Sequence, residues 1–389
     1  MILKFPENFF WGTATSAYQV EGGIKNDWSE IENINQEYDK YNAGIACDHY
    51  NRFEEDFDLA KSMNNNAHRF SIEWARIEPE EDRFDQNEIE HYRKVILALK
   101  QRGLEPFVSL YHWTLPIWFA KQGGWLNPKA PEYFARFTEK VVLEYKDLVK
   151  FWITLNEPNV YAPNCYLQGV WTPFVKNIFK TIKVAKQLVK AHKFSFEVIK
   201  KIAPNSQAGL VTNNTWFRGI IKIFADYIYN HWFLNKIKND YDFIGLNHYF
   251  THSLFSAISH LKVRQNMTDN QLTDMGWRIV PEGIYRVLMD LKKYNKPIYV
   301  TENGLADAKD EKRAKFIVDH LRWIHKAIED GIDVRGYFYW SLLDNFEWDK
   351  RFWPKFGLIE TDYENGLKRI PRLSSKIYAE ICKNNSINI

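Results

Sequence analysis

Cysteine is scarce in this sequence. Its three cysteines, Cys47, Cys165 and Cys382, lie far apart and are odd in number. Such spacing argues against a disulfide framework and predicts reduced thiols. No apolar run approaches the roughly 20 residues that a membrane-spanning helix needs, so we expect no membrane partner. The stretch MILKFPENFFWGTAT at the N-terminus lacks the regions of a signal peptide, so the expected location is the cytoplasm.

The sequence also lacks a large net charge and the residue spacings that are typical of metal-binding sites. The formal net charge is +3, and acidic and basic residues are interspersed without a long basic run. This pattern has no electrostatic signature of nucleic-acid binding, so we expect no nucleic-acid partner. The histidines stand at spacings that do not match metal-binding motifs, so we expect no metal and no cofactor.

Linkers rich in proline, glycine or serine do not divide the chain. Its 389 residues exceed the size of one ordinary domain, but α/β barrels often reach that length as single units. Hydrophobic residues make up 45% and charged residues 26%, which is sufficient for a large packed core. We therefore predict a single domain over residues 1–389.

Eight short apolar runs have the character of buried strands, each followed by a loop and a helical pattern. The runs span 9–17, 67–74, 105–112, 150–157, 207–214, 242–249, 297–304 and 334–344. Helical stripes between them, such as 87–103 and 313–331, end in Gly103 and Gly331. Eight such units predict an α/β fold, a (β/α)₈ TIM barrel. A doubly wound sheet is the alternative, but WGTAT supplies no glycine-rich phosphate turn after the first strand.

Polar and aromatic residues stand at the C-terminal ends of these strands, where the active site of such a barrel lies. Glu157 ends the fourth strand and Glu302 the seventh, so the two carboxylates can face each other across the barrel mouth. Enzymes that cleave glycosidic bonds use two carboxylates on either side of the bond that breaks. A purely structural alternative is that each glutamate only pairs with an arginine.

The motifs around these residues resemble those of one family. TLNEP and TENG, with FFWGTATSAYQVEG, HRFSIEWARI, YHWTLP and WSLLDNFEW, are similar to family 1 glycoside hydrolases, the β-glucosidase family. The resemblance covers residues from about 5 to about 380. It implies a retaining β-glycosidase that acts on a small β-glycoside or oligosaccharide, with Glu157 as acid/base and Glu302 as nucleophile.

The resemblance also implies the residues that bind the sugar. Arg69 and Tyr249 would support the nucleophile, Trp340 would lie beneath the sugar ring, and Trp277 would form a wall on the leaving-group side. The implied substrate-binding set is Gln19, His112, Trp113, Asn156, Asn247, Tyr249, Trp277, Trp340, Glu347, Trp348 and Phe356. Glu347 argues against 6-phosphorylated sugars, because its charge would repel the phosphate.

Two questions about function stay open at the level of the sequence. Glucosyl, galactosyl and fucosyl residues are not separated, and a transglycosylase or an inactive sugar-binding relative are the alternatives to a hydrolase. The connection between the fifth and sixth strands, about 215–241, is shorter than is usual in the family and leaves room for roughly one helix.

Overall fold

A computed structural model of the chain describes residues 1–33, 42–218, 222–253 and 272–388. Its centre is a closed barrel of parallel strands in the order β10-β11-β2-β3-β4-β5-β6-β8. The strands are β2 (Phe10–Ala14), β3 (Ala67–Ser71), β4 (Glu105–Ser109), β5 (Phe151–Asn156), β6 (Gln207–Asn213), β8 (Phe243–Asn247), β10 (Ile298–Asn303) and β11 (Val334–Trp340). Each lies inside one of the eight expected runs, and the predicted (β/α)₈ barrel is confirmed.

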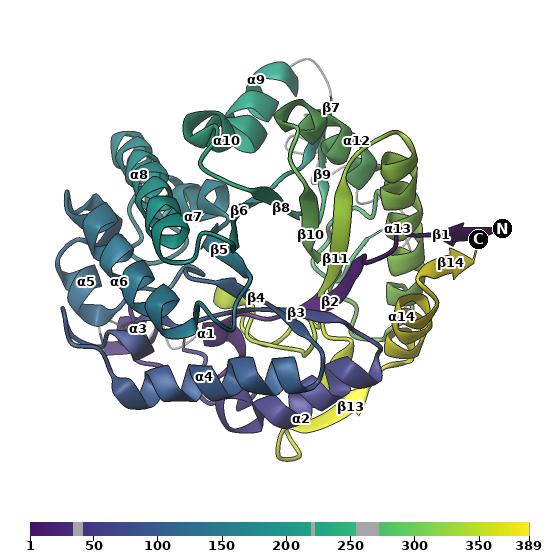
Figure 1. The fold of residues 1–389 in the computed structure, drawn as a ribbon, viewed down its shortest axis with the longest axis horizontal. Coiled ribbons are helices and arrows are strands. Elements are labelled where there is room, and N and C mark those ends of the chain that lie inside the picture. Colours follow the sequence, from purple (N-terminus) through teal and green to yellow (C-terminus); the bar gives the residue numbers. More distant parts are fainter. Residues whose placement is uncertain (34–41, 219–221, 254–271, 389) are drawn as a thin grey trace.

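Helices form an outer ring around the strands (Figure 1). The longer ones are α2 (His49–Ser62), α4 (Gln86–Gln101), α6 (Ala130–Tyr145), α8 (Ile178–Ile202), α12 (Glu282–Leu291), α13 (Arg313–Glu329) and α14 (Leu373–Asn384). Local sequence explains their ends. The Asp85 side chain accepts from the backbone N–H groups of Asn87 and Glu88 at the start of α4, and Gly103 follows its end with φ +67°.

Short elements complete the fold. The two ends of the chain meet where β1 (Ile2–Lys4) pairs with β14 (Ser386–Asn388), as Figure 1 shows. Two other short pairs are β12 (Ile359–Asp362) with β13 (Lys368–Pro371), and β7 (Trp216–Arg218) with β9 (Thr251–Ser253). Short helices at the C-terminal ends of the barrel strands include α1 (Ala17–Val20), α3 (Trp74–Ile77), α5 (Ile117–Lys121) and α7 (Pro158–Pro163). Among the described residues no helix is long and apolar enough to cross a bilayer.

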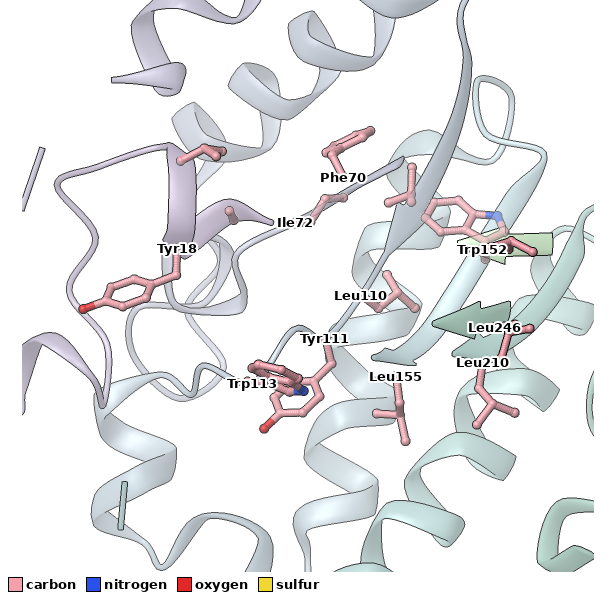
Figure 2. Packing of buried hydrophobic residues seen from close by; sticks show 14 of the residues in the cluster. Tyr18, Phe70, Ile72, Leu110, Tyr111, Trp113, Trp152, Leu155, Leu210 and Leu246 are labelled. Carbon is pink, nitrogen blue, oxygen red and sulfur yellow. The ribbon is translucent and has the colours of Figure 1, made fainter. Parts of the chain in front are cut away.

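Alternate residues of each barrel strand face two different cores. On β5, Phe151 and Ile153 belong to the core inside the barrel, whereas Trp152 packs in the outer core. A register shift after Ile153 interrupts the alternation, and Leu155 also packs in the outer core. Figure 2 shows Leu155 with Leu210 and Leu246, which belong to the neighbouring strands of the outward-facing layer. Inside, aromatic rings fill the barrel, and those of Phe107 and Phe151 stack at a centroid distance of 4.2 Å.

The short connection between β6 and β8 is mostly helical. After β7 it contains α9 (Lys222–Asp226), a π-helical turn (Tyr227–His231) and α10 (Trp232–Ile237), which succeed one another directly. Its aromatic residues divide between solvent and core, since the side chain of Phe224 is 69% exposed and that of Phe233 only 3%. Phe233 thus contributes to the outer core, whereas most of the Phe224 side chain faces solvent.

Candidate active site

A cavity of about 350 Å³ opens at the C-terminal ends of the barrel strands. Sites in this barrel fold are built there, because the loops that come after the strands converge at that end. Most of the residues singled out from the sequence line it: Gln19, His112, Trp113, Glu157, Tyr249, Trp277, Glu302, Trp340, Glu347, Trp348 and Phe356. The structure therefore gathers predicted site residues from six of the eight strand ends into one cavity.

Glu157 stands at the point where β5 ends and α7 begins. Its backbone is in the left-handed region with φ 44°, and its N–H donates to the carbonyl of Val211 on β6 at 2.8 Å. Carboxamides of Asn247 and Asn213 donate to its Oε1 at 2.6 and 3.1 Å. Burial, and after it the negative charge of Glu302, raises the pKa of Glu157 above its usual range, although the two amides act in the opposite direction. This carboxyl group is therefore suited to carry a proton near neutral pH.

Glu302 stands at the end of β10 and is held by two donors. The guanidinium of Arg69 forms an ion pair with its Oε1, and the hydroxyl of Tyr249 donates to its Oε2 at 2.6 Å. Gly304 lies against β11 so closely that a Cβ atom there would collide with the carbonyl oxygen of Trp340. The turn after Glu302 thus requires glycine, which explains the last residue of TENG.

Arg69, Asn156 and Asn247 form a buried polar layer and do not line the cavity. Arg69 donates through Nη2 to Asn156 Oδ1 at 2.7 Å, and Asn247 Nδ2 also approaches that oxygen, at 3.3 Å. The hydroxyl of Thr301 donates to Asn247 Oδ1 at 2.7 Å, which fixes the orientation of that amide. The structure therefore places Asn156 and Asn247 in the network that orients the two glutamates, and their contact with the substrate stays a prediction.

A second polar group lines the same cavity. Gln19 donates through Nε2 to Glu347 Oε2 at 3.2 Å, and its Oε1 accepts from Ser16. Burial, followed by the charge of Glu302, raises the pKa of Glu347 to about 8. A buried carboxyl and a carboxamide side by side offer both donors and acceptors to hydroxyl groups of a bound ligand.

His112 lines the cavity and has one ring nitrogen without a partner in the described part of the chain. Asn156 donates through Nδ2 to Nε2 of this ring at 3.2 Å, an orientation fixed by Arg69 on the other side of the amide. Nδ1 is buried and has no hydrogen-bond partner among the described residues. Burial also holds the pKa of His112 well below its usual value, so the ring is neutral and Nδ1 carries its proton.

Indole and phenyl rings form the walls of the cavity. Trp113 and Trp348 pack with ring centroids 4.8 Å apart, and Trp277 lies 5.9 Å from Tyr249 and 6.3 Å from Phe356. Trp113 and Trp348 have positive φ values of 76° and 52°. Backbone strain of this kind gathers at functional sites, where surrounding structure holds it. Flat apolar faces beside polar groups suit a sugar, which has an apolar C–H face and a rim of hydroxyls.

Several residues that line the cavity were not anticipated from the sequence. They include Asn159, Asn164, Gln168 and Trp171 in the segment after β5, Asn213 and Tyr229 in and after β6, Phe250 and Met275, and Asp349 with Lys350 after Glu347. Of these residues, only Asn213 could have been recognised from the sequence. It ends the fifth strand in the run LVTNN, the one strand end at which we predicted no site residue.

Comparisons with known proteins agree with this geometry. The family model for glycosyl hydrolase family 1 matches residues 1–228 and 230–387. Beta-glucosidase A from Thermotoga maritima is 35% identical, and the match covers 99% of each chain. The 1,4-beta-D-glucan glucohydrolase from Thermotoga neapolitana is 33% identical, again over 99% of each chain.

Solved structures of β-glycosidases are also similar to this chain. The beta-glycosidase from Pyrococcus horikoshii superimposes with a TM-score of 0.91 at 38% identity, covering 100% of this chain and 97% of that one. The beta-glucosidase from Thermotoga maritima in complex with noeuromycin gives a TM-score of 0.89 at 32% identity, covering 99% and 100%. The chain therefore belongs to glycosyl hydrolase family 1 and is a β-glucosidase-type enzyme that hydrolyses O-glycosyl compounds.

Proposed function

We propose that the enzyme is a retaining β-glycosidase that removes terminal, non-reducing β-D-glucosyl residues through a covalent glycosyl-enzyme intermediate. The observation that supports this most is the unequal environment of the two glutamates. Glu302 receives a guanidinium and a phenol on its two oxygens, whereas burial raises the pKa of Glu157. One group is thus equipped as nucleophile and the other as acid.

In the first step an oxygen of Glu302 attacks the anomeric carbon while the bond to the leaving oxygen breaks. The electron pair of that bond goes to the leaving oxygen, which takes a proton from Glu157. Tyr249 and Arg69 hold Glu302 in line for this attack, because each bonds a different oxygen of the carboxylate. The product is an ester between Glu302 and the sugar, together with a neutral alcohol.

In the second step water replaces the ester. Esterification removes the negative charge of Glu302, one of the two main causes that raise the pKa of Glu157, so that pKa falls and Glu157 serves as base. It accepts a proton from the attacking water, and the ester bond breaks with its electron pair returning to Glu302. Two displacements at the same carbon leave the configuration unchanged.

We assign recognition of the glycone to Gln19, Glu347 and His112, which line the same cavity. Gln19 and Glu347 offer hydrogen bonds to the hydroxyls remote from the anomeric carbon, and His112 adds a neutral imidazole. Trp340 and Trp348 supply apolar faces for the ring. The same groups can meet an axial or an absent hydroxyl, so β-D-galactosyl and β-D-fucosyl residues stay alternatives as substrates.

A panel of aryl β-glycosides, assayed with and without an added acceptor sugar, tests the proposal. We expect release of glucose from the β-glucoside, no cleavage of the α-glucoside, and much slower cleavage of a 6-phospho-β-glucoside, because Glu347 would face the phosphate. If added acceptor sugar captured most of the glycosyl groups at low concentration, transglycosylation would be the better description. No turnover of any member would favour an inactive sugar-binding protein.

A further inference from the structure

Helix α8 exposes large apolar side chains in its first turns. Phe179 is 80% exposed, and Ile178 and Ile182 are nearly half exposed. Single exposed apolar side chains are common on soluble proteins, but three within five residues of one helix form a patch. Val184 and Leu188, on the other face of α8, are buried in the outer core, so the three exposed side chains lie outside that core.

Lysines accompany this patch, and acidic residues do not. The stretch 158–196 contains six lysines and neither aspartate nor glutamate. Within the described part of the chain, only Lys193 of the six forms an ion pair, with Asp240. The other five are exposed, and they are Lys176, Lys180, Lys183, Lys186 and Lys190. This sector of the surface therefore has a strong local surplus of positive charge.

The helix brings both kinds of side chain to one face. Positions 179, 183, 186 and 190 are three or four residues apart, the spacing that aligns side chains along one side of an α-helix. A groove of about 440 Å³ lies there, and its lining includes Phe179, Ile182, Lys183, Lys186 and Lys190. None of its lining residues is acidic. Because apolar residues separate the lysines in the sequence, this basic face does not appear there as a basic run.

The combination of apolar and cationic side chains fits an anionic lipid surface. A second copy of the chain would bring lysines against lysines, which repel each other. A nucleic acid would neutralise the lysines but would leave Phe179 in water. A bilayer with anionic lipids offers phosphate groups to the lysines and, directly beneath them, an apolar boundary for Phe179 and Ile182.

We propose that the exposed face of α8 binds the surface of membranes that contain anionic lipids. Phe179 and Ile182 insert between the head groups, while Lys183, Lys186 and Lys190 contact the phosphates. This contact is peripheral, since no helix within the described residues could cross a bilayer. The sequence offered no spanning segment and led us to expect no membrane partner, whereas the folded helix presents a surface for one.

Co-sedimentation of the full chain with phospholipid vesicles tests the proposal. We expect binding to phosphatidylcholine vesicles that contain about 30 mol% phosphatidylglycerol, and at least about 10-fold weaker binding to pure phosphatidylcholine. Raising the salt concentration from about 0.05 M to about 0.5 M should weaken binding to the anionic vesicles, because salt screens the lysine charges. Equal binding to both kinds of vesicle, or binding to neither, would overturn the proposal, and this comparison needs no variant.

A lysine variant locates the contact on α8. Changing three lysines of the groove to glutamine should lower the partition coefficient on anionic vesicles about 10- to 100-fold, because each lysine near the surface adds to the attraction. The matched control removes three exposed lysines from α13 and α14, on the other side of the barrel in Figure 1, and should bind like the wild type. The two sets are Lys183→Gln, Lys186→Gln and Lys190→Gln, and Lys315→Gln, Lys376→Gln and Lys383→Gln. Equal losses in both sets would overturn the assignment to α8.

An apolar variant separates a membrane from an acidic macromolecule. Phe179→Ser with Ile182→Ser should lower the partition coefficient about 10-fold, because the inserted side chains are lost. Leu373→Ser with Ile377→Ser on α14 is the matched control, since Leu373 is 69% and Ile377 40% exposed. Both variants should keep wild-type activity on an aryl β-glucoside, because α8 and α14 contribute no described residue to the active-site cavity. If only the lysine variant lost binding and soluble polyglutamate displaced the vesicles, the partner would be an acidic macromolecule and the membrane proposal would be wrong.

Discussion

Replacing Glu302 by alanine is expected to lower kcat on an aryl β-glucoside by about 10⁴-fold or more, equal to a barrier increase of about 5.5 kcal/mol. The loss results from the absence of the attacking oxygen, which no neighbouring group can replace. Arg69 and Tyr249 both contact Glu302, but they act there as hydrogen-bond donors and do not replace the attacking oxygen. Added azide or formate should occupy the vacated space, attack the anomeric carbon once and give an α-configured product.

The configuration of that product is the result of the Glu302→Ala experiment that best identifies the nucleophile. Wild-type enzyme in the same azide concentration controls for an effect of azide on the rest of the site. A β-configured azide product from Glu302→Ala, or near-normal turnover without azide, would mean that another group is the nucleophile. Circular dichroism of the variant would show whether the loss of the ion pair with Arg69 has disturbed the fold.

Replacing Glu157 by alanine is expected to affect substrates differently, according to how much protonation their leaving groups need. Aryl glucosides with good leaving groups should still form the glycosyl-enzyme, because they need little protonation, whereas poor leaving groups should lose about 10²- to 10⁴-fold in kcat/KM. Hydrolysis of the intermediate should be slow in both cases, because the base is missing. Azide should restore turnover and give a β-configured product, since it displaces the ester on Glu302.

The pH dependence tests the same residue. The pKa of Glu157 is raised by burial and by Glu302, so the acid form is present below that pKa and activity should fall as pH rises through it. This basic limb should lie above the usual range of a carboxyl group and should vanish in Glu157→Ala. Glu157→Gln, which keeps the shape of the side chain but cannot supply a proton, is the matched control and should lose the limb too. A basic limb that persists unchanged in both variants would assign the acid to another group.

The barrel and the two glutamates could be predicted because their signals are local. A strand buried on both faces is a continuous apolar run, and a carboxylate at its C-terminal end stands out against that run. Glu157 directly follows β5 and Glu302 is the last residue but one of β10, close to the predicted strand ends, and the walls contain Trp277, Trp340 and Trp348. The resemblance of the motifs added the roles of these side chains.

Features that could not be predicted depend on contacts between elements. Asn156 and Asn247 are the last residues of β5 and β8, but the hydrogen bond from Arg69 on β3 to Asn156 is a contact between strands that the sequence does not show. Trp171 and Asp349 come from loops, whose paths have no periodicity in the sequence, and they meet through a hydrogen bond of 3.0 Å. Asn213 was missed for a different reason, since asparagine at a strand end is also a common sign of a turn.

The configuration of the first sugar released by the wild type tests the central proposal most directly. Proton NMR recorded during the first minutes of hydrolysis of an aryl β-glucoside distinguishes the two anomers of glucose before they equilibrate. Double displacement through an ester on Glu302 predicts that the β-anomer appears first and the α-anomer only later, by mutarotation. Initial release of the α-anomer would show a single displacement by water and would contradict the covalent role proposed for Glu302.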